Sequence, residues 1–340
     1  MKLKETNRVM ETENMRHFSR SAVANLIRML SLCVLVALSA PVWAQGDGTP
    51  YRIVVPTTAG GPLDVVGRVL AAALAKNLKE TVVVENRPGA SAIIGTDYVA
   101  KAAPDGRTLL LASGFVVTNP LLYKVNFDWQ RELRSVIELS QAGMILATRR
   151  DLDARNPADL RRVAELQPGG LNCAAPPGEM ALACDQLKQV LGGAVVPVPY
   201  PGVAPAMNAL SGGQVDVMFA PFDSVVPQVE GKRIVALANG GTRAALPPLD
   251  GLPLLKDTWP GFTVIGFLGI LAPAGTPTET VNRLNAEFNR ILVDPKVREF
   301  LLARGSRPQE NGPEKLAATL AERAEHYRRL ASQIGLKPQQ

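Results

Sequence analysis

The sequence has very few of the residues from which many enzyme centres are built. Its 340 residues include only 2 histidines and 3 cysteines, and aromatic residues make up 5% of the chain. With so few histidines, the chain is a poor candidate for a Ser-His-Asp triad or a histidine-bound metal. Scarce aromatics and scattered basic residues also argue against a nucleic-acid surface. We expect a protein with no catalytic residues, no metal, no cofactor and no nucleic-acid partner.

Long apolar runs are also missing, except near the N-terminus. Basic residues there precede the apolar run 29–40, and small residues end at Ala44. This order predicts an export signal, residues 1–44, that is cleaved before Gln45. The run is too short to span a bilayer, so a retained anchor is the weaker interpretation. We expect the mature chain to be periplasmic.

The cysteines and the histidines each divide between the leader and the mature chain. Cys33 belongs to the expected leader, which leaves Cys173 and Cys184. In an oxidising compartment this pair favours a disulfide over a metal site. His326 is the histidine that remains, and its polar helical surroundings predict that it is exposed to solvent.

The rest of the chain alternates apolar strands with amphipathic helices, at a length that suits two lobes better than one core. Strand and helix alternate from residue 51 to residue 111, which predicts βαβ crossovers in a parallel sheet. A connecting region, 113–134, and a strand, 136–148, lead to a second α/β region. The expected elements are strands at 52–55, 81–85, 108–112, 195–199, 215–219, 234–238 and 264–271, and helices at 65–78, 94–102, 157–167, 182–191, 204–211, 278–292 and 313–334.

Four loops follow expected strands, at residues 56–64, 86–97, 113–120 and 172–178. Ligands of open α/β sheets bind outside the carboxyl ends of strands, so these loops converge if the sheets are parallel. In the first loop, Gly60-Gly61 precedes Asp64, which we expect to cap the next helix. Backbone N–H groups at such a turn attract a small anion, most plausibly a carboxylate. Any one of these loops alone is better explained as a tight turn without a ligand, but four such loops at the ends of strands favour a ligand-binding site.

Eight motifs occur in order along the chain, from Tyr51 to about Leu330. They are Val55-Pro56…Ala59-Gly-Gly-Pro62…Asp64, Val84-Glu-Asn-Arg-Pro-Gly-Ala90, Ile94-Gly-Thr96, Ala100-Lys-Ala-Ala-Pro-Asp-Gly106-Arg-Thr-Leu, Asn119-Pro120, Val198-Pro-Tyr200-Pro-Gly202, Gly212-Gly-Gln-Val-Asp216-Val-Met and Leu271-Ala-Pro-Ala-Gly-Thr-Pro277. Together and in this order, they resemble the periplasmic substrate-binding proteins of tripartite tricarboxylate transporters, the Bug family.

The resemblance implies an α/β protein of the type II periplasmic binding fold, with two α/β lobes and a hinge. Residues 45–146 plus 267–340 would form the first lobe, and 147–266 the second. The family holds a small carboxylate between the lobes, largely through backbone amides. The resemblance also implies membrane permease subunits as partners, and we expect a monomer. Carried over, the ligand-binding residues are Thr57, Thr58, Ala59, Gly60, Gly61, Asp64, Ser113, Gly114, Asn119, Ala174, Ala175 and Gly178.

The chain departs from the family pattern where the second lobe would meet the ligand. The usual Gly-Ser-x-Gly-x-Gly-Ser loop is here Ala174-Ala-Pro-Pro-Gly178, and the usual Lys is Pro201. Lost serine hydroxyls and proline N–H groups leave fewer donors for a second carboxylate. This favours a monocarboxylate or less polar acid over citrate. A ligand sensor that signals to a membrane partner is the alternative function, and an exported hydrolase or isomerase is a weaker one.

Overall fold

The computed structural model describes residues 49–333 and residue 335, so the expected export signal at 1–44 lies outside the described residues. Every helix and strand described below belongs to one compact unit, Pro50–Gln340. Within this described part, no helix has both the length and the apolar character needed to cross a bilayer.

The first sheet has five strands and joins the beginning of the chain to its return near the end. Its order is β2-β1-β3-β10-β4, where β1 pairs in parallel with β2 and β3, while β10 runs antiparallel to both β3 and β4. The predicted parallel crossovers are therefore confirmed for three strands. The strands are β1 (Tyr51–Val55), β2 (Val82–Asn86), β3 (Thr108–Ala112), β4 (Leu133–Gly143) and β10 (Ile265–Pro273).

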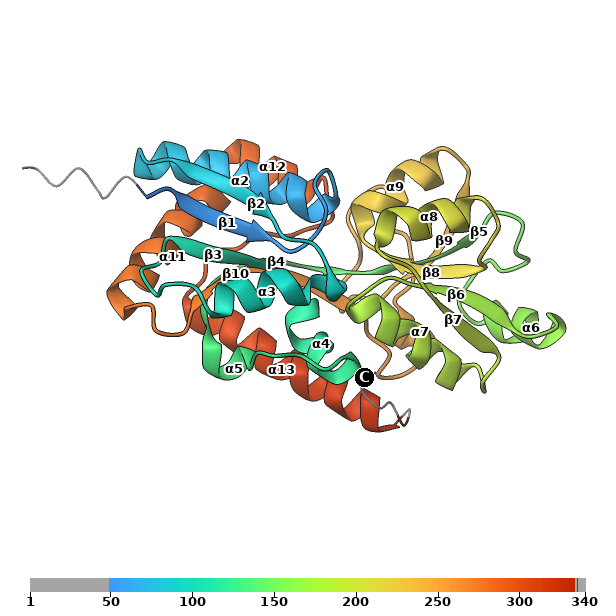
Figure 1. The fold of residues 1–340 in the computed structure, drawn as a ribbon. Coiled ribbons are helices and arrows are strands. Elements are labelled where there is room, and N and C mark those ends of the chain that lie inside the picture. Colours follow the sequence, from blue (N-terminus) through green and yellow to red (C-terminus); the bar gives the residue numbers. More distant parts are fainter. Residues whose placement is uncertain (1–48, 334, 336–340) are drawn as a thin grey trace, which may run out of the picture. The chain divides into compact units, whose positions relative to one another are not determined.

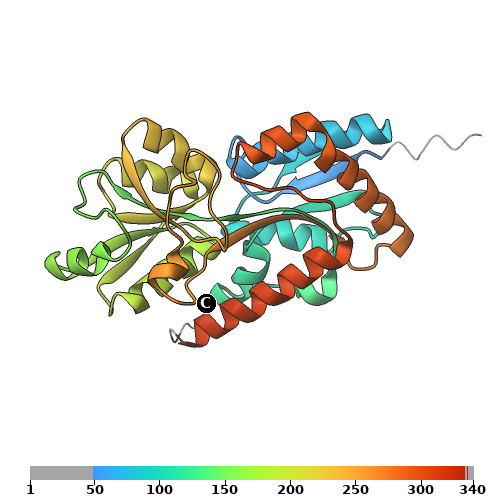
Figure 2. The same ribbon diagram turned by 180° about the vertical axis from the view of Figure 1, so that it is seen from behind.

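Alternate residues of these strands enter two separate cores, one on each face of the sheet. Ile53 and Val55 pack into one core and Val54 into the other, as the alternation of side chains along a strand requires. One core contains α2 (Pro62–Leu78), α11 (Thr278–Val293) and α12 (Pro295–Leu302). The other contains α3 (Ile93–Ala100), α4 (Phe115–Leu122) and α13 (Pro313–Gln333), and Figures 1 and 2 show the two groups on opposite sides of the sheet.

The second sheet repeats this pattern, with the order β7-β6-β8-β5-β9. The parallel trio β7-β6-β8 is followed by β5, which runs antiparallel to β8 and β9. The expectation of two α/β lobes is therefore confirmed. The elements are β5 (Ile145–Arg149), α6 (Asp159–Leu166), β6 (Leu171–Ala175), α7 (Glu179–Val190), β7 (Val195–Pro199), α8 (Val203–Ser211), β8 (Val217–Ala220), α9 (Phe222–Glu230), β9 (Ile234–Asn239) and α10 (Leu255–Thr258).

The chain crosses between the two sheets at Met144 and returns through the segment 240–264. Backbone hydrogen bonds join the two crossings: Met144 N donates to Val264 O at 2.9 Å, and Gly240 N donates to Met144 O at 2.8 Å. Val264 N in turn donates to Gly240 O at 2.9 Å. These three residues form the link that the expected hinge requires.

Several expected elements are wrong in kind or in extent. The single strand expected at 136–148 is two strands, β4 and β5, which belong to different sheets. The expected connection 113–134 contains α4 and a short helix, α5 (Trp129–Glu132). The helices α9, α10 and α12 and a 3₁₀ turn at Ala90–Ala92 were not expected.

Cys173 and Cys184 are joined by a disulfide with a Cα–Cα distance of 5.8 Å. The bond connects β6 to the middle of α7, and both side chains are fully buried in the core of the second lobe. The segment between them is therefore not simply a loop: α7 begins at Glu179, three residues before the helix expected at 182–191.

We expect replacement of both cysteines by alanine to destabilise the protein, because the disulfide lowers the conformational entropy of the unfolded chain. The expected loss is up to about 3 kcal/mol, or a melting temperature lower by roughly 5–10 °C. A thiol reductant should lower the melting temperature of the wild type but not of the double variant. A wild-type melting temperature unchanged by reductant would contradict the prediction.

Candidate functional site

The first predicted loop follows β1 and carries Thr57, Thr58, Ala59, Gly60 and Gly61. The middle three of these residues are exposed, while Thr57 and Gly61 are half-buried. Gly60 has φ +80°, a conformation that side chains disfavour. The loop therefore presents its backbone to solvent at the carboxyl end of a parallel strand, as predicted.

Asp64 is not the N-cap of the next helix, contrary to expectation. The helix α2 begins at Pro62 with Gly61 as its N-cap, because proline at the first position lacks only an N–H that the helix would leave unpaired. Asp64 lies in the first turn with its side chain 2% exposed. It accepts hydrogen bonds from Gly60 N at 2.8 Å, Arg68 Nε at 2.9 Å and Asn86 Nδ2 at 2.9 Å. Asp64 therefore fixes the first loop to the first turn of α2 through its bond from Gly60.

The electrostatics of Asp64 agree with this role. Burial acts to raise the pKa of its carboxyl, but the hydrogen bonds from Arg68, Gly60 and Asn86 outweigh it and leave the pKa below the ordinary value of 3.8. Asp64 is therefore ionised at neutral pH and acts as an acceptor rather than as a general acid.

The third predicted loop is largely helical. Gly114 is the N-cap of α4, and Asn119 lies inside this helix, fully buried, although a connecting loop was expected there. Asn119 Nδ2 donates to the backbone oxygen of Ser91 at 2.7 Å, in the second loop. Ser113 precedes the helix and is half-buried.

In the second lobe, the predicted loop 172–178 is also shorter than expected. Ala174 and Ala175 belong to β6, where they pair with β7 and pack into the cores on opposite faces of the second sheet. Gly178 is the N-cap of α7. Backbone at Gly178, rather than at the two alanines, is therefore the part of this motif that lies outside the strand ladder.

Contacts along the loops bring most of the predicted residues into one region. Asn86 Nδ2 donates to Thr57 O at 3.2 Å, which connects the first two loops. The bond from Asn119 to Ser91 connects the second loop to the third. Across the lobes, a Cβ placed on Gly178 would lie 3.8 Å from Phe115 N. The loops of the first lobe and the α7 N-terminus of the second thus meet.

Glu179 is a residue of this region that the sequence analysis missed. It follows Gly178 directly, yet its carboxylate contacts the first lobe: a Cβ on Gly114 would overlap Oε2 of Glu179. The side chain is 2% exposed, and burial raises its pKa to about 7. An acidic residue just after the loop that lacks the family's serines was the available signal.

Arg87 and His326 have other surroundings. Arg87, in the second loop, forms an ion pair with Glu85 at 2.6 Å and lies over the ring of Tyr98 at 3.5 Å, so its guanidinium is held by residues of the first lobe. His326 is half-buried rather than exposed, and burial together with Arg323 lowers its pKa. Among the described residues, no group of three histidine, cysteine or acidic side chains is placed to hold a metal ion.

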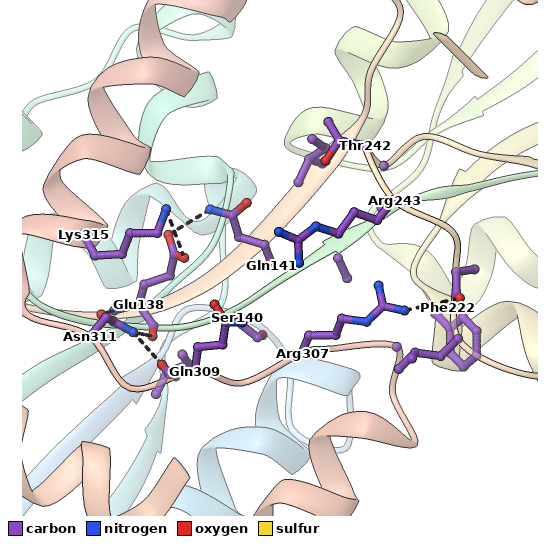
Figure 3. Close-up of a pocket in the computed structure, with 18 of the residues that line it drawn as sticks. Glu138, Ser140, Gln141, Phe222, Thr242, Arg243, Arg307, Gln309, Asn311 and Lys315 are labelled. Carbon is purple, nitrogen blue, oxygen red and sulfur yellow. Dashed lines mark hydrogen bonds and ion pairs between the residues drawn. The ribbon is translucent and has the colours of Figure 1, made fainter. Parts of the chain in front are cut away.

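A cavity of about 430 Å³ lies elsewhere, at the outer edge of β4. It is lined by β4, by residues 241–246 that follow β9, and by the segment before α13, as Figure 3 shows. None of its lining residues belongs to the predicted ligand-binding set.

Some of the polar side chains that line this cavity are paired. Glu138 accepts from Gln141 at 3.0 Å and from Thr319, and lies 4.0 Å from Lys315. Arg307 donates to Ala244 O at 3.1 Å, across the two lobes. The loops around Gly114 remain our candidate for the ligand site, because they follow the carboxyl ends of the parallel strands β1 and β3.

Two α/β lobes of matching topology, joined through two hydrogen-bonded crossings of the chain, define the class of two-lobed binding proteins. The family is equally clear. The model of the tripartite tricarboxylate transporter family receptor, TctC, matches residues 66–336, and the chain belongs to this family. The resemblance inferred from the motifs is therefore confirmed, and with it the type II periplasmic binding fold.

Known relatives cover nearly the whole chain. A protein encoded in the tcbD–tcbE intergenic region of Pseudomonas sp. (strain P51) is 31% identical over 296 residues, 86% of this chain and 88% of its own. Among solved structures, Rpa4515 of R. palustris with adipate has a TM-score of 0.79 and 28% identity, covering 85% of this chain and 98% of its own. BugD has a TM-score of 0.77 and 32% identity, with 85% and 99% covered. MatC of Rhodopseudomonas palustris with bound malate has a TM-score of 0.75 and 28% identity, and the match covers 83% of this chain and 98% of MatC.

We expect Asp64→Asn to destabilise the protein by about 1–3 kcal/mol, because buried donors lose an anionic acceptor. The wild-type contribution is present above pH 3.8 and is lost as the pH falls through the lowered pKa of the folded state. Urea unfolding at several pH values measures both effects, and Asp64→Asn should lack this acid-dependent step.

Asp128→Asn is the matched control for this substitution. Asp128 caps the short helix α5 through a bond to Gln130 N at 3.0 Å and is exposed. Asparagine caps helices about as well as aspartate, so little change is expected. Equal losses in the two variants would refute the special role of Asp64.

Proposed function

We propose that this protein is a periplasmic receptor that captures a small organic carboxylate between its lobes and delivers it to membrane permease subunits of a tripartite transporter. Membership of the receptor family supports the proposal. In the same proposal, residues 1–44 direct export, and the lobes divide near the bounds expected from the sequence, 45–146 plus 267–340 and 147–266, with the change of sheet at Met144 and Val264. The receptor acts as a monomer and uses no cofactor or catalytic residue.

The observation that carries the proposal is a pair of unsatisfied oxygens in the predicted loops. Among the residues that the structure describes, Thr57 Oγ1 and Asn119 Oδ1 are buried and have no hydrogen-bond partner. Buried polar atoms are nearly always paired, so each exception needs an explanation. Thr57 lies in the loop after β1 and Asn119 in α4, which follows β3, so both come after parallel strands of the first sheet. A polar ligand there would supply the missing partner through a donor or an ordered water.

A small carboxylate is the ligand class that these loops favour. The exposed backbone of 58–60 offers N–H donors, and Thr57 adds a hydroxyl that can donate to a carboxylate. Two relatives of known structure are described with adipate and with malate, both carboxylates. The second lobe of this chain lacks the serines of the family loop, which supports a ligand with one carboxylate rather than a tricarboxylate such as citrate.

The proposed mechanism is closure around the ligand. The lobes move about the crossing at Met144, and a ligand that contacts both lobes binds the closed arrangement more tightly than the open one. The ligand therefore selects the closed form, which the permease recognises.

Calorimetric titration with the acid that gives the largest shift in a thermal screen of organic acids tests the proposal. We expect Thr57→Val to weaken binding about tenfold, since one hydrogen bond to a charged group contributes roughly 1.5 kcal/mol. Thr148→Val is the matched control, because Thr148 Oγ1 in β5 is likewise buried and unpartnered but lies outside the predicted loops.

Two outcomes would contradict the proposal. The first is that no carboxylate in the screen raises the melting temperature, since a ligand in excess of its dissociation constant must stabilise the folded state. The second is equal binding of the acid by Thr57→Val and Thr148→Val, which would place the ligand elsewhere. A tricarboxylate as the tightest ligand would overturn the narrower assignment to monocarboxylates.

A further inference from the structure

Glu179 is carried by one lobe and buried against the other. It begins α7 in the second lobe, and its neighbours belong to the first. A Cβ on Gly114 would overlap its Oε2, and a Cβ on Gly266 in β10 would lie 2.9 Å from its Oε1. Glycine at these two positions leaves room for the carboxylate where it lies. In the open form of the proposed closure mechanism, these neighbours lie apart from Glu179, and its side chain is accessible from the space between the lobes.

The groups that face Glu179 do not neutralise it. No described residue forms an ion pair with it within 4.0 Å. Its own backbone N–H and, at longer range, Arg323 of α13 favour the ionised form, but burial outweighs both and raises its pKa to about 7. The other titratable neighbour on α13 is Tyr327, whose own pKa is raised by burial and by Glu179.

Glu179 also adjoins the predicted ligand-binding residues of both lobes. It follows Gly178 in the chain and contacts Gly114, the N-cap of α4. A carboxylate buried without a direct ion-pair partner costs free energy unless a partner arrives with the ligand. A cationic group would recover that cost, whereas a second carboxylate would add repulsion.

We propose that Glu179 determines specificity by contacting the end of the ligand that faces the second lobe, and that it selects ligands with an ammonium group at that end. The preferred ligands are then amino acids in the broad sense, with a carboxylate at the first-lobe loop and a cationic nitrogen at Glu179. This inference rests on the proposed function and narrows its ligand class. Where the family loop of the second lobe has serine hydroxyls that donate hydrogen bonds, this chain then has the Glu179 carboxylate, which accepts them.

Matched ligand pairs test the charge at the second end directly. Each pair keeps the carbon chain and exchanges one carboxylate for an amine: succinate and 3-aminopropanoate, glutarate and 4-aminobutanoate, adipate and 5-aminopentanoate. Calorimetry gives the affinity ratio of amine to diacid in each pair. We expect the wild type to favour the amine in at least one pair, and Glu179→Gln to lower that ratio at least about tenfold, since one charge–charge contact supplies roughly that factor.

The pH dependence of the wild type provides a second readout that needs no variant. Between about pH 6 and about pH 8 the charges of the probes stay nearly constant, whereas a carboxyl with a pKa of about 7 becomes ionised. The ratio of amine to diacid affinity should therefore rise with pH in the wild type. In Glu179→Gln it should stay flat.

Asp223→Asn is the control for removal of a half-buried carboxyl at the contact between lobes. Asp223 lies at the start of α9, its pKa is raised by burial, and its neighbour is Arg304 at 3.7 Å. It is not among the predicted ligand-binding residues, so its replacement should leave the ratio unchanged. Melting curves verify that both variants are folded.

The inference fails if the wild type favours the diacid in every pair, if no probe binds, or if Glu179→Gln leaves the ratio within about twofold of the wild type. It also fails if the wild-type ratio does not rise with pH. In each of these cases the proposed function survives as long as another carboxylate from the wider screen binds and Thr57→Val weakens it. The two failures are therefore distinguishable.

Discussion

The hydrogen-bonded crossing of Met144, Gly240 and Val264 is the constraint on which the rest of the structure depends. Each lobe has a complete sheet with its own cores, and the backbone bonds of this crossing connect the two sheets. A Cβ on Gly240 would lie 2.9 Å from Val264 O and 3.0 Å from Met144 O, so only glycine permits this approach. Because backbone groups make the bonds, the crossing can bend without loss of a side-chain contact, as a hinge requires.

Side chains decide what happens on either side of this crossing. Arg307 of the first lobe donates to the carbonyls of Ala244 and Ala245 in the second, beside the cavity in Figure 3. Near the predicted loops, Glu179 contacts Gly114. The first contact is a pair of hydrogen bonds at exposed positions and the second is a buried carboxylate, so the two differ in their response to charge.

The strands of the first lobe were predictable because burial imposes a simple pattern on them. Thr108–Ala112 is found with the expected bounds, and β1 differs by one residue. The errors arise where local signals compete with packing. Pro120 lies inside α4 although proline disfavours helices, and burial of its neighbours compensates. Ala174 and Ala175 have little strand propensity, yet β7 and β8 on either side hold them in the sheet.

The candidate site shows a different limit of sequence reasoning. The backbone loops at Gly60 and Gly178 were identifiable, because glycine patterns at the ends of strands reflect local geometry. The role of Glu179 depends on Gly114 and Gly266, which are 65 and 87 residues away in the chain, so no local pattern shows it. Its burial follows only when two lobes meet, and so does its raised pKa. In the receptor that we propose, the loops of the first lobe select a carboxylate, and the carboxylate that the second lobe buries at Glu179 selects among carboxylates by charge.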